Sequence, residues 1–161
     1  MTFTVIDVQG FQLDNRFVPK EIALTNDGIN IQHFNFESFM PYATLSNDEK
    51  NQVRYLQYNY HGINYSAPGL PPSEIGSILN NFIINNEVSG IYVKGHQKKI
   101  FLKKIISATI PIINVEYEFE CPKFSKCEPP LCDSQCHSMT SNVFCATKNC
   151  TDLYNWLSEY F

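Results

Sequence analysis

The sequence predicts an α/β fold, in which a mixed sheet of three antiparallel and then two parallel strands is flanked by helices. Three strand-like segments joined by turn signals come first, over residues 2–8, 17–24 and 29–36. Helix-like and buried strand-like segments then alternate to the end of the chain. When three antiparallel strands are followed by alternating helices and strands, the later strands are expected to lie parallel to one another beside the first three.

The first strand contains a polar interruption. Its residues are mostly β-branched, which is typical of a buried strand, but Asp7 lies among them. A carboxylate there costs free energy unless another group pairs with it. Residues 10–16 are predicted to form a polar turn, and Pro19 marks a sheet edge or a bulge in the second strand. The apolar positions of the third strand change phase near His33, which predicts a bulge there.

The remaining elements follow from helical spacing and from short apolar runs. Ser46 and Glu49 have the spacing of a capping box before the first helix. The expected helices cover residues 49–60, 73–84, 97–106 and 147–160, and the expected buried strands cover 89–93 and 111–117.

Length and composition predict one domain over residues 1–161. A formal net charge of -4 argues against broad electrostatic binding of nucleic acid, but it leaves room for a local basic patch. The sequence has neither an evident export signal nor an apolar run of about 18 residues, the length of a membrane helix. We therefore expect an intracellular protein, cytoplasmic or nuclear, without membrane association.

All six cysteines lie between Cys121 and Cys150, in a Cys/His-rich loop over 121–150. Because intracellular thiols stay reduced, this clustering favours a structural zinc ion. The spacing Cys132-x3-Cys136-His137-x7-Cys145 closes a tetrahedral site if one more ligand comes from elsewhere. Disulfides in an exported protein, or free thiols, are the alternative interpretations.

Several short motifs occur in an order that resembles the DEDD 3′–5′ exonuclease superfamily. They are Asp7-Val8-Gln9, Glu21-Ile22-Ala23, His61-Gly62-Ile63, the segment from Tyr92 to Leu102, and Cys145-Ala146-Thr147-Lys148-Asn149. The resemblance covers nearly the whole chain. It implies a ribonuclease H-like fold, in which acidic side chains hold two divalent cations for phosphodiester hydrolysis.

The family's acids are mostly replaced in this chain. The first acid remains as Asp7, whereas Gln9, Lys98 and Asn149 stand at the other acidic positions. The resemblance therefore implies a pseudo-nuclease without catalytic Mg²⁺, in which the Lys98 ammonium neutralises Asp7. Asn149 also fits a helix N-cap, which would explain it without any ancestral catalysis.

The chain more closely resembles the Maelstrom domain, a ribonuclease H-like domain with a zinc site in place of the acids. That resemblance implies zinc ligation by Glu21, by Cys132 or Cys136, by His137 and by Cys145, although the family's spacing falls on Ser134. It also implies a role in nucleic-acid silencing or defence. The Pro19-Lys20-Glu21 and Tyr92-Val93-Lys94-Gly95 segments resemble an uncharacterised group of arthropod and arthropod-virus proteins.

A basic patch formed by Lys94, Lys98, Lys99 and Lys103 would contact phosphates, or would simply be a solvated helix face. We therefore expect a catalytically degenerate module that binds RNA or another single-stranded nucleic acid. A protein-interaction scaffold is the alternative. An active metal-dependent nuclease that uses Asp7 is the third hypothesis.

Overall fold

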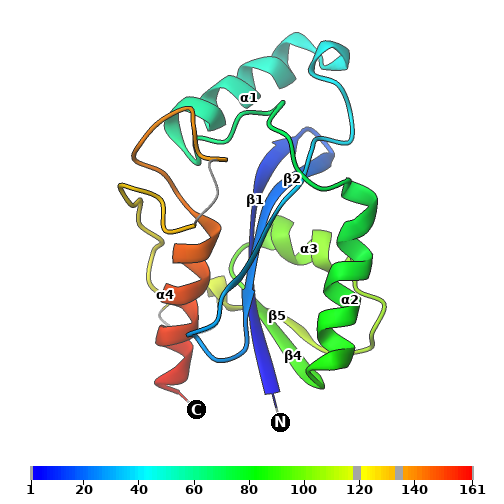
Figure 1. Cartoon of the computed structure of the whole chain (residues 1–161), viewed down its shortest axis with the longest axis vertical. Coiled ribbons are helices and arrows are strands. Elements are labelled where there is room, and N and C mark those ends of the chain that lie inside the picture. Colours follow the sequence, from blue (N-terminus) through cyan, green and yellow to red (C-terminus); the bar gives the residue numbers. More distant parts are fainter. Residues whose placement is uncertain (1, 118–120, 133–135, 161) are drawn as a thin grey trace.

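The computed structural model describes residues 2–117, 121–132 and 136–160, and confirms the α/β fold with a mixed sheet (Figure 1). Within these residues the sheet has five strands in the order β3-β2-β1-β4-β5. The strands are β1 (Thr2–Leu13), β2 (Arg16–Thr25), β3 (Gln32–Asn35), β4 (Val88–Val93) and β5 (Ile112–Asn114). The helices are α1 (Asn47–Asn59), α2 (Ile75–Asn85), α3 (His96–Ile105) and α4 (Ala146–Ser158).

The strand directions match the predicted order of an antiparallel unit followed by parallel strands. β1 pairs antiparallel with β2, and β2 pairs antiparallel with β3. β4 then pairs in parallel with both β1 and β5. Figure 1 shows α4 on one side of the sheet, α2 and α3 on the other, and α1 across the end of the β1–β2 hairpin.

Alternation along β1 divides its side chains between two apolar clusters. Ile6 and Val8 pack in the cluster that includes residues of α2 and α3. Val5 packs with Ala23 against α4. Because side chains alternate along a strand, Asp7 and Gln9 share the α4 face with Val5. This face carries the polar groups described below.

The prediction of a turn over residues 10–16 is wrong for most of this range. β1 continues to Leu13 and β2 begins at Arg16, so only two residues connect the strands. Phe11 and Leu13 are fully buried, and their alternation continues the apolar pattern of the strand. Asp14 in the connection has φ +36°, in the left-handed region that tight hairpins need.

The bulge lies in β2 and not near His33. His33 pairs regularly with Ala23, and β3 is shorter than predicted. In the β1–β2 ladder, Gln9 pairs with Glu21 but Gly10 pairs with Pro19, which leaves Lys20 as the extra residue. The bulge expected at Pro19 is therefore present, at the point where proline lacks the N–H that a ladder requires.

Smaller differences concern the ends of the elements. The segment after Asn114 turns into a short 3-10 helix, Val115–Tyr117, instead of continuing the predicted strand. The predicted capping box of Ser46 and Glu49 is present. Ser134 lies outside the described residues. None of the helices in the described ranges combines the length and the apolar character that crossing a bilayer requires.

Candidate functional site

Asp7, Gln9, Lys98 and Asn149, the four positions singled out by the resemblance, converge in the structure. Asp7 is completely buried and its carboxylate accepts three hydrogen bonds. Gln9 Nε2 and Asn149 Nδ2 each donate to Asp7 Oδ2 at 3.0 Å. Lys98 Nζ donates to Asp7 Oδ1 at 2.6 Å. The expected contact of Lys98 with Asp7 is therefore present.

Three elements bring these side chains together. Gln9 follows Asp7 by two residues and faces the same side of β1. Lys98 comes from the first turn of α3, which begins beyond the carboxyl end of β4. Asn149 lies in the first turn of α4 and is not the N-cap, because Cys145 occupies that position. The side chain of Asn149 is thus used for Asp7, and its Oδ1 has no hydrogen-bond partner among the described residues.

This donor set does not fit a two-cation hydrolytic centre. Such a centre needs several carboxylates to offset the charge of the cations. Here both amide groups donate N–H to Asp7, and an ammonium group lies at 2.6 Å from it. The buried carboxylate is thereby paired with a positive charge supplied by the chain itself.

A pocket of about 310 Å³ opens beside Lys98, and we call it the lysine pocket. It combines ammonium groups with aromatic rings. Lys94 Nζ lies 4.7 Å from the ring centroid of Phe124, and Lys98 Nζ lies 5.6 Å from it. The rings of Tyr60 and Phe144 are 4.5 Å apart. The lining residues are Tyr60, Lys94, Gly95, Lys98, Glu116, Lys123, Phe124 and Phe144.

Only two of the four lysines of the predicted basic patch line this pocket. Lys94 and Lys98 line it, whereas Lys99 and Lys103 are not among its lining residues. The Cys-rich loop contributes a further lysine, Lys123, which was not predicted from the sequence. The adjacent Lys123-Phe124 pair was the available signal, because basic and aromatic residues together are typical of nucleic-acid surfaces.

A second cluster of polar groups lies on the same face of the sheet. Ligand atoms of Glu21, Cys132, Cys136 and His137 all lie within 4.8 Å of one another, and all four residues are buried. These residues could hold a metal ion, and we call the cluster the metal centre. The centre includes both cysteines between which the sequence left a choice. Cys145 is outside this set of four, although it hydrogen-bonds with Cys132 and His137.

The carboxylate of Glu21 joins the metal centre to α4. Glu21 Oε2 lies 2.6 Å from His137 Nε2 and 2.8 Å from His33 Nε2. Glu21 Oε1 accepts a hydrogen bond from the backbone N–H of Ala146, the first residue of α4, at 2.8 Å. A carboxylate at a helix N-terminus is favoured by the helix dipole.

His137 is oriented as metal-binding histidines usually are. Its Nδ1 contacts the backbone carbonyl of His61, so its Nε2 faces Glu21 and the centre. His61 is itself buried, donates from Nε2 to the carbonyl of Gly10 at 2.9 Å and accepts the N–H of Ile63. Burial lowers the pKa of His61 to about 4, so this ring is neutral at physiological pH.

Proton sharing shifts the pKa values of the thiols at the centre. A hydrogen bond from Cys132 lowers the pKa of Cys136 to about 5 and that of Cys145 to about 4. The pKa of Cys132 is raised correspondingly. Burial would raise the pKa of Glu21, but hydrogen bonds from His137 and His33 outweigh it and hold the pKa well below its usual range. Such a set of anions suits a divalent cation.

Two further titratable side chains near the metal centre, those of His33 and Lys20, were not predicted from the sequence. His33 bonds to Glu21, and its contacts with Cys136 and Glu21 outweigh burial and raise its pKa to about 9. Lys20, the bulge residue, is buried and donates to the carbonyls of Tyr65 at 3.1 Å and Ala67 at 3.0 Å. Burial lowers the pKa of Lys20 to about 8.

The cysteines are not joined by disulfide bonds in the described residues. Cys150 is separate from the metal centre, because its thiol donates to the carbonyl of Val5 inside the core. Comparisons with family models, with curated proteins and with solved structures found no match for this chain.

Proposed function

We propose that the chain is a non-catalytic ribonuclease H-like module that binds single-stranded nucleic acid, RNA in particular, in the lysine pocket. A structural zinc ion at the metal centre holds the loop that forms one wall of this pocket. The order of strands supports the ribonuclease H-like part of the proposal, since a central first strand lies between an antiparallel unit and a parallel unit.

The observation that carries the proposal is the ion pair of Lys98 with Asp7. In a hydrolytic centre this carboxylate would bind a divalent cation. Here the ammonium contacts one carboxylate oxygen of Asp7, and the two amides donate to the other oxygen. The arrangement weighs against an active nuclease that uses Asp7. The adjoining lysine pocket is lined by three lysines and one acidic residue, Glu116.

The walls of the lysine pocket suit a single strand better than a duplex. Phosphates would contact the ammonium groups of Lys94 and Lys123, and bases would stack on the rings of Phe124 and Phe144. Base stacking tolerates any sequence because every base has a π-face. The positive charge is local, which is compatible with the net charge of -4 for the whole chain.

The donor types at the metal centre support zinc. Zinc prefers cysteine sulfur, histidine nitrogen and, less often, carboxylate oxygen, in a closed tetrahedral site when its role is structural. His137 and the cysteines around it come from the loop, while Glu21 comes from β2. A zinc ion there would fasten the loop to the sheet.

Binding is tested by fluorescence anisotropy with short single-stranded RNA and DNA of mixed sequence at about 50 mM salt, where phosphate contacts are strong. We expect binding that does not depend on Mg²⁺, with no shortening of the strands. RNA and DNA probes of the same sequence show whether the 2′-hydroxyl matters. Failure to bind either strand would contradict the proposal and favour the protein-interaction scaffold.

A matched pair of variants locates the site. Lys123→Glu reverses an exposed charge that lines the lysine pocket, whereas Lys103→Glu reverses an exposed charge on α3 outside it. We expect weaker binding and a salt slope smaller by about 0.7 for the first variant, because one phosphate contact is lost. Equal losses in the two variants would show that only net charge matters.

A further inference from the structure

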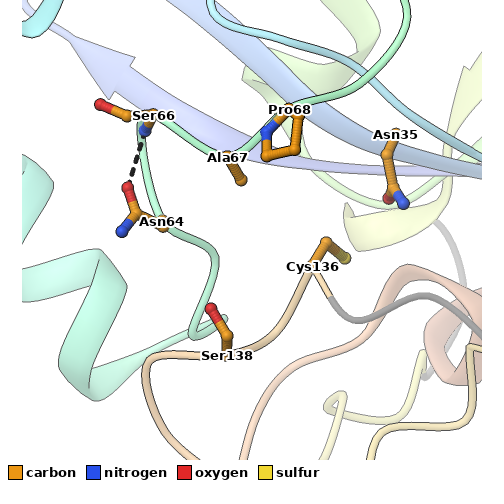
Figure 2. A pocket seen from close by; sticks show the side chains of 7 residues that line it. All are labelled: Asn35, Asn64, Ser66, Ala67, Pro68, Cys136 and Ser138. Carbon is orange, nitrogen blue, oxygen red and sulfur yellow. Dashed lines mark hydrogen bonds between the residues drawn. The ribbon is translucent and has the colours of Figure 1, made fainter.

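A separate pocket of about 610 Å³, which shares no lining residue with the lysine pocket, reaches the metal centre at Cys136. Figure 2 shows its two walls: one segment carries Asn64, Ser66, Ala67 and Pro68, and the other carries Cys136 and Ser138, with Asn35 beside them. Among the four residues of the metal centre, Cys136 is the one that lines this pocket. We call it the Cys136 pocket.

The Cys136 pocket gives small molecules a route to one sulfur of the centre. Its lining is neutral apart from that sulfur, so it would admit a small uncharged molecule. The Sγ of Cys132 lies within 4.8 Å of the Sγ of Cys136. Since a disulfide needs an S–S distance of about 2.05 Å, a local shift of the two side chains would join them.

The loop that carries these cysteines also forms the lysine pocket. Lys123, Phe124 and Phe144 line that pocket, and Cys132, Cys136 and His137 lie between them in sequence. The loop is further attached to the segment that follows α1 by hydrogen bonds from the N–H of Met139 to the carbonyl of Gly62 and from the N–H of Phe144 to the carbonyl of Tyr60.

Loss of the metal would therefore remove one of the links that join this loop to Glu21 on the sheet, beside the direct contact of His137 with Glu21. The side chains that wall the lysine pocket would lose their fixed positions with it.

We infer that the metal centre is an oxidation-sensitive switch: a hydroperoxide enters the Cys136 pocket, Cys136 and Cys132 become a disulfide, the metal is released and the loop opens. The inference deepens the proposed function, and it rests on that function for the resulting loss of nucleic-acid binding. The oxidation itself does not require nucleic acid.

The chemistry balances with hydrogen peroxide as the oxidant. The Cys136 thiolate attacks one peroxide oxygen, the O–O bond breaks, and a sulfenic acid and hydroxide form. The Cys132 thiolate then attacks the sulfenic sulfur, the S–S bond forms, and a second hydroxide leaves. Two protons from solvent convert the hydroxides to water. The two sulfurs supply the two electrons, and the metal leaves as an unchanged divalent cation.

The test treats the full metal-loaded chain with hydrogen peroxide and follows metal release with a chromogenic chelator. Peptide mass mapping locates the disulfide, and limited trypsin digestion reports on the loop through cleavage after Lys123 and Lys126. We expect the release of one metal ion per chain, a disulfide between Cys132 and Cys136, and faster cleavage at both lysines. A thiol reductant with added zinc should reverse all three changes.

A matched pair of variants tests the route of the oxidant. Ala67→Leu adds bulk to a side chain that lines the Cys136 pocket, while Ala43→Leu makes the same change at an exposed position outside it. Neither residue belongs to the metal centre or to the lysine pocket. We expect severalfold slower metal release from Ala67→Leu, and a wild-type rate from Ala43→Leu.

Three results would overturn the inference: a chain that contains no metal as purified, a metal that stays bound while peroxide is consumed, or equal release rates from the two alanine variants. These results are independent of the proposed binding function. If the reduced, metal-loaded chain binds no nucleic acid but releases metal as expected, the binding proposal fails and the oxidation switch stands.

Discussion

Gln9 and Glu21 face each other across the β1–β2 ladder, so the Asp7 site and the metal centre are neighbours on one face of the sheet. The first turn of α4 contacts both of them. The N–H of Ala146 bonds to Glu21, and the side-chain amide of Asn149 bonds to Asp7. A single helical turn thus connects the two sites.

Replacing Lys98 by methionine should destabilise the fold by about 3 kcal/mol, because it leaves the buried carboxylate of Asp7 without its counter-charge. Urea denaturation of the wild type and of Lys98→Met measures the loss in the free energy of unfolding. The double variant Asp7→Asn, Lys98→Met should recover most of it. If the single variant is as stable as the wild type, the ion pair of Lys98 with Asp7 does not stabilise the fold.

Placing acids at the three positions that contact Asp7 should create a cation site. The triple variant Gln9→Glu, Lys98→Asp, Asn149→Asp places four carboxylates where three side chains now contact Asp7. We expect Mn²⁺ to stabilise this variant by about 2.7 kcal/mol when it is present at a hundred times its dissociation constant. The wild type, titrated in parallel by thermal denaturation, should show no comparable shift. No stabilisation of the triple variant would mean that these positions do not converge as described.

Removal of the zinc ion proposed for the metal centre should lower stability by several kcal/mol, on the order of the folding energy that structural zinc supplies. A chelator titration followed by thermal unfolding measures the effect, with zinc content determined by elemental analysis. Cys136→Ser should reproduce it, because Cys136 belongs to the metal centre. Cys121→Ser should retain the metal, since Cys121 lies outside that set. Loss of metal from both variants would point to a different ligand set.

The fold should lose stability in acid through His61. Burial lowers the pKa of His61 from 6.5 to about 4, so the unfolded chain takes up this proton at a higher pH than the folded chain. The free energy of unfolding should therefore fall as the pH drops from about 6.5 to about 4, by about 3 kcal/mol at 1.36 kcal/mol per pKa unit.

His61→Gln isolates this contribution, because glutamine can donate to the carbonyl of Gly10 without titrating in that range. The metal ligands also take up protons in acid, so the informative quantity is the difference in slope between the variant and the wild type. Equal slopes would show that His61 is not the responsible group.

The sequence predicted the α/β fold and the buried Asp7 because both leave local signals, since Asp7 interrupts an apolar strand. Gln9, Lys98 and Asn149 were expected beside Asp7 only through the resemblance to the exonuclease motifs, and the structure brings them into contact with it. The metal-ligating types were also visible, since cysteines concentrated in one loop are informative without a structure. Glu21 was expected on the second strand, and its side chain lies at the metal centre.

Other features depend on register, which the sequence does not display. The partnership of His33 with Glu21 follows from the pairing of β3 with β2. Pro19 signalled a bulge in the second strand, but the burial of the extra residue Lys20 was hidden, because a lysine in a strand normally indicates an exposed position. The length of β1 was underestimated, because Gly10 and Gln12 make the continuing strand resemble a polar turn.

Lys20 is one extra residue in β2 that has no partner in β1. The pairing of β1 with β2 is regular on both sides of Lys20, so a strand one residue shorter would form the same hairpin and keep Glu21 on its face. Such a deletion would leave the carbonyls of Tyr65 and Ala67 without their ammonium donor. The surplus residue thus tethers the 65–67 segment to the sheet, and shortening the strand should damage that distant segment more than the hairpin itself.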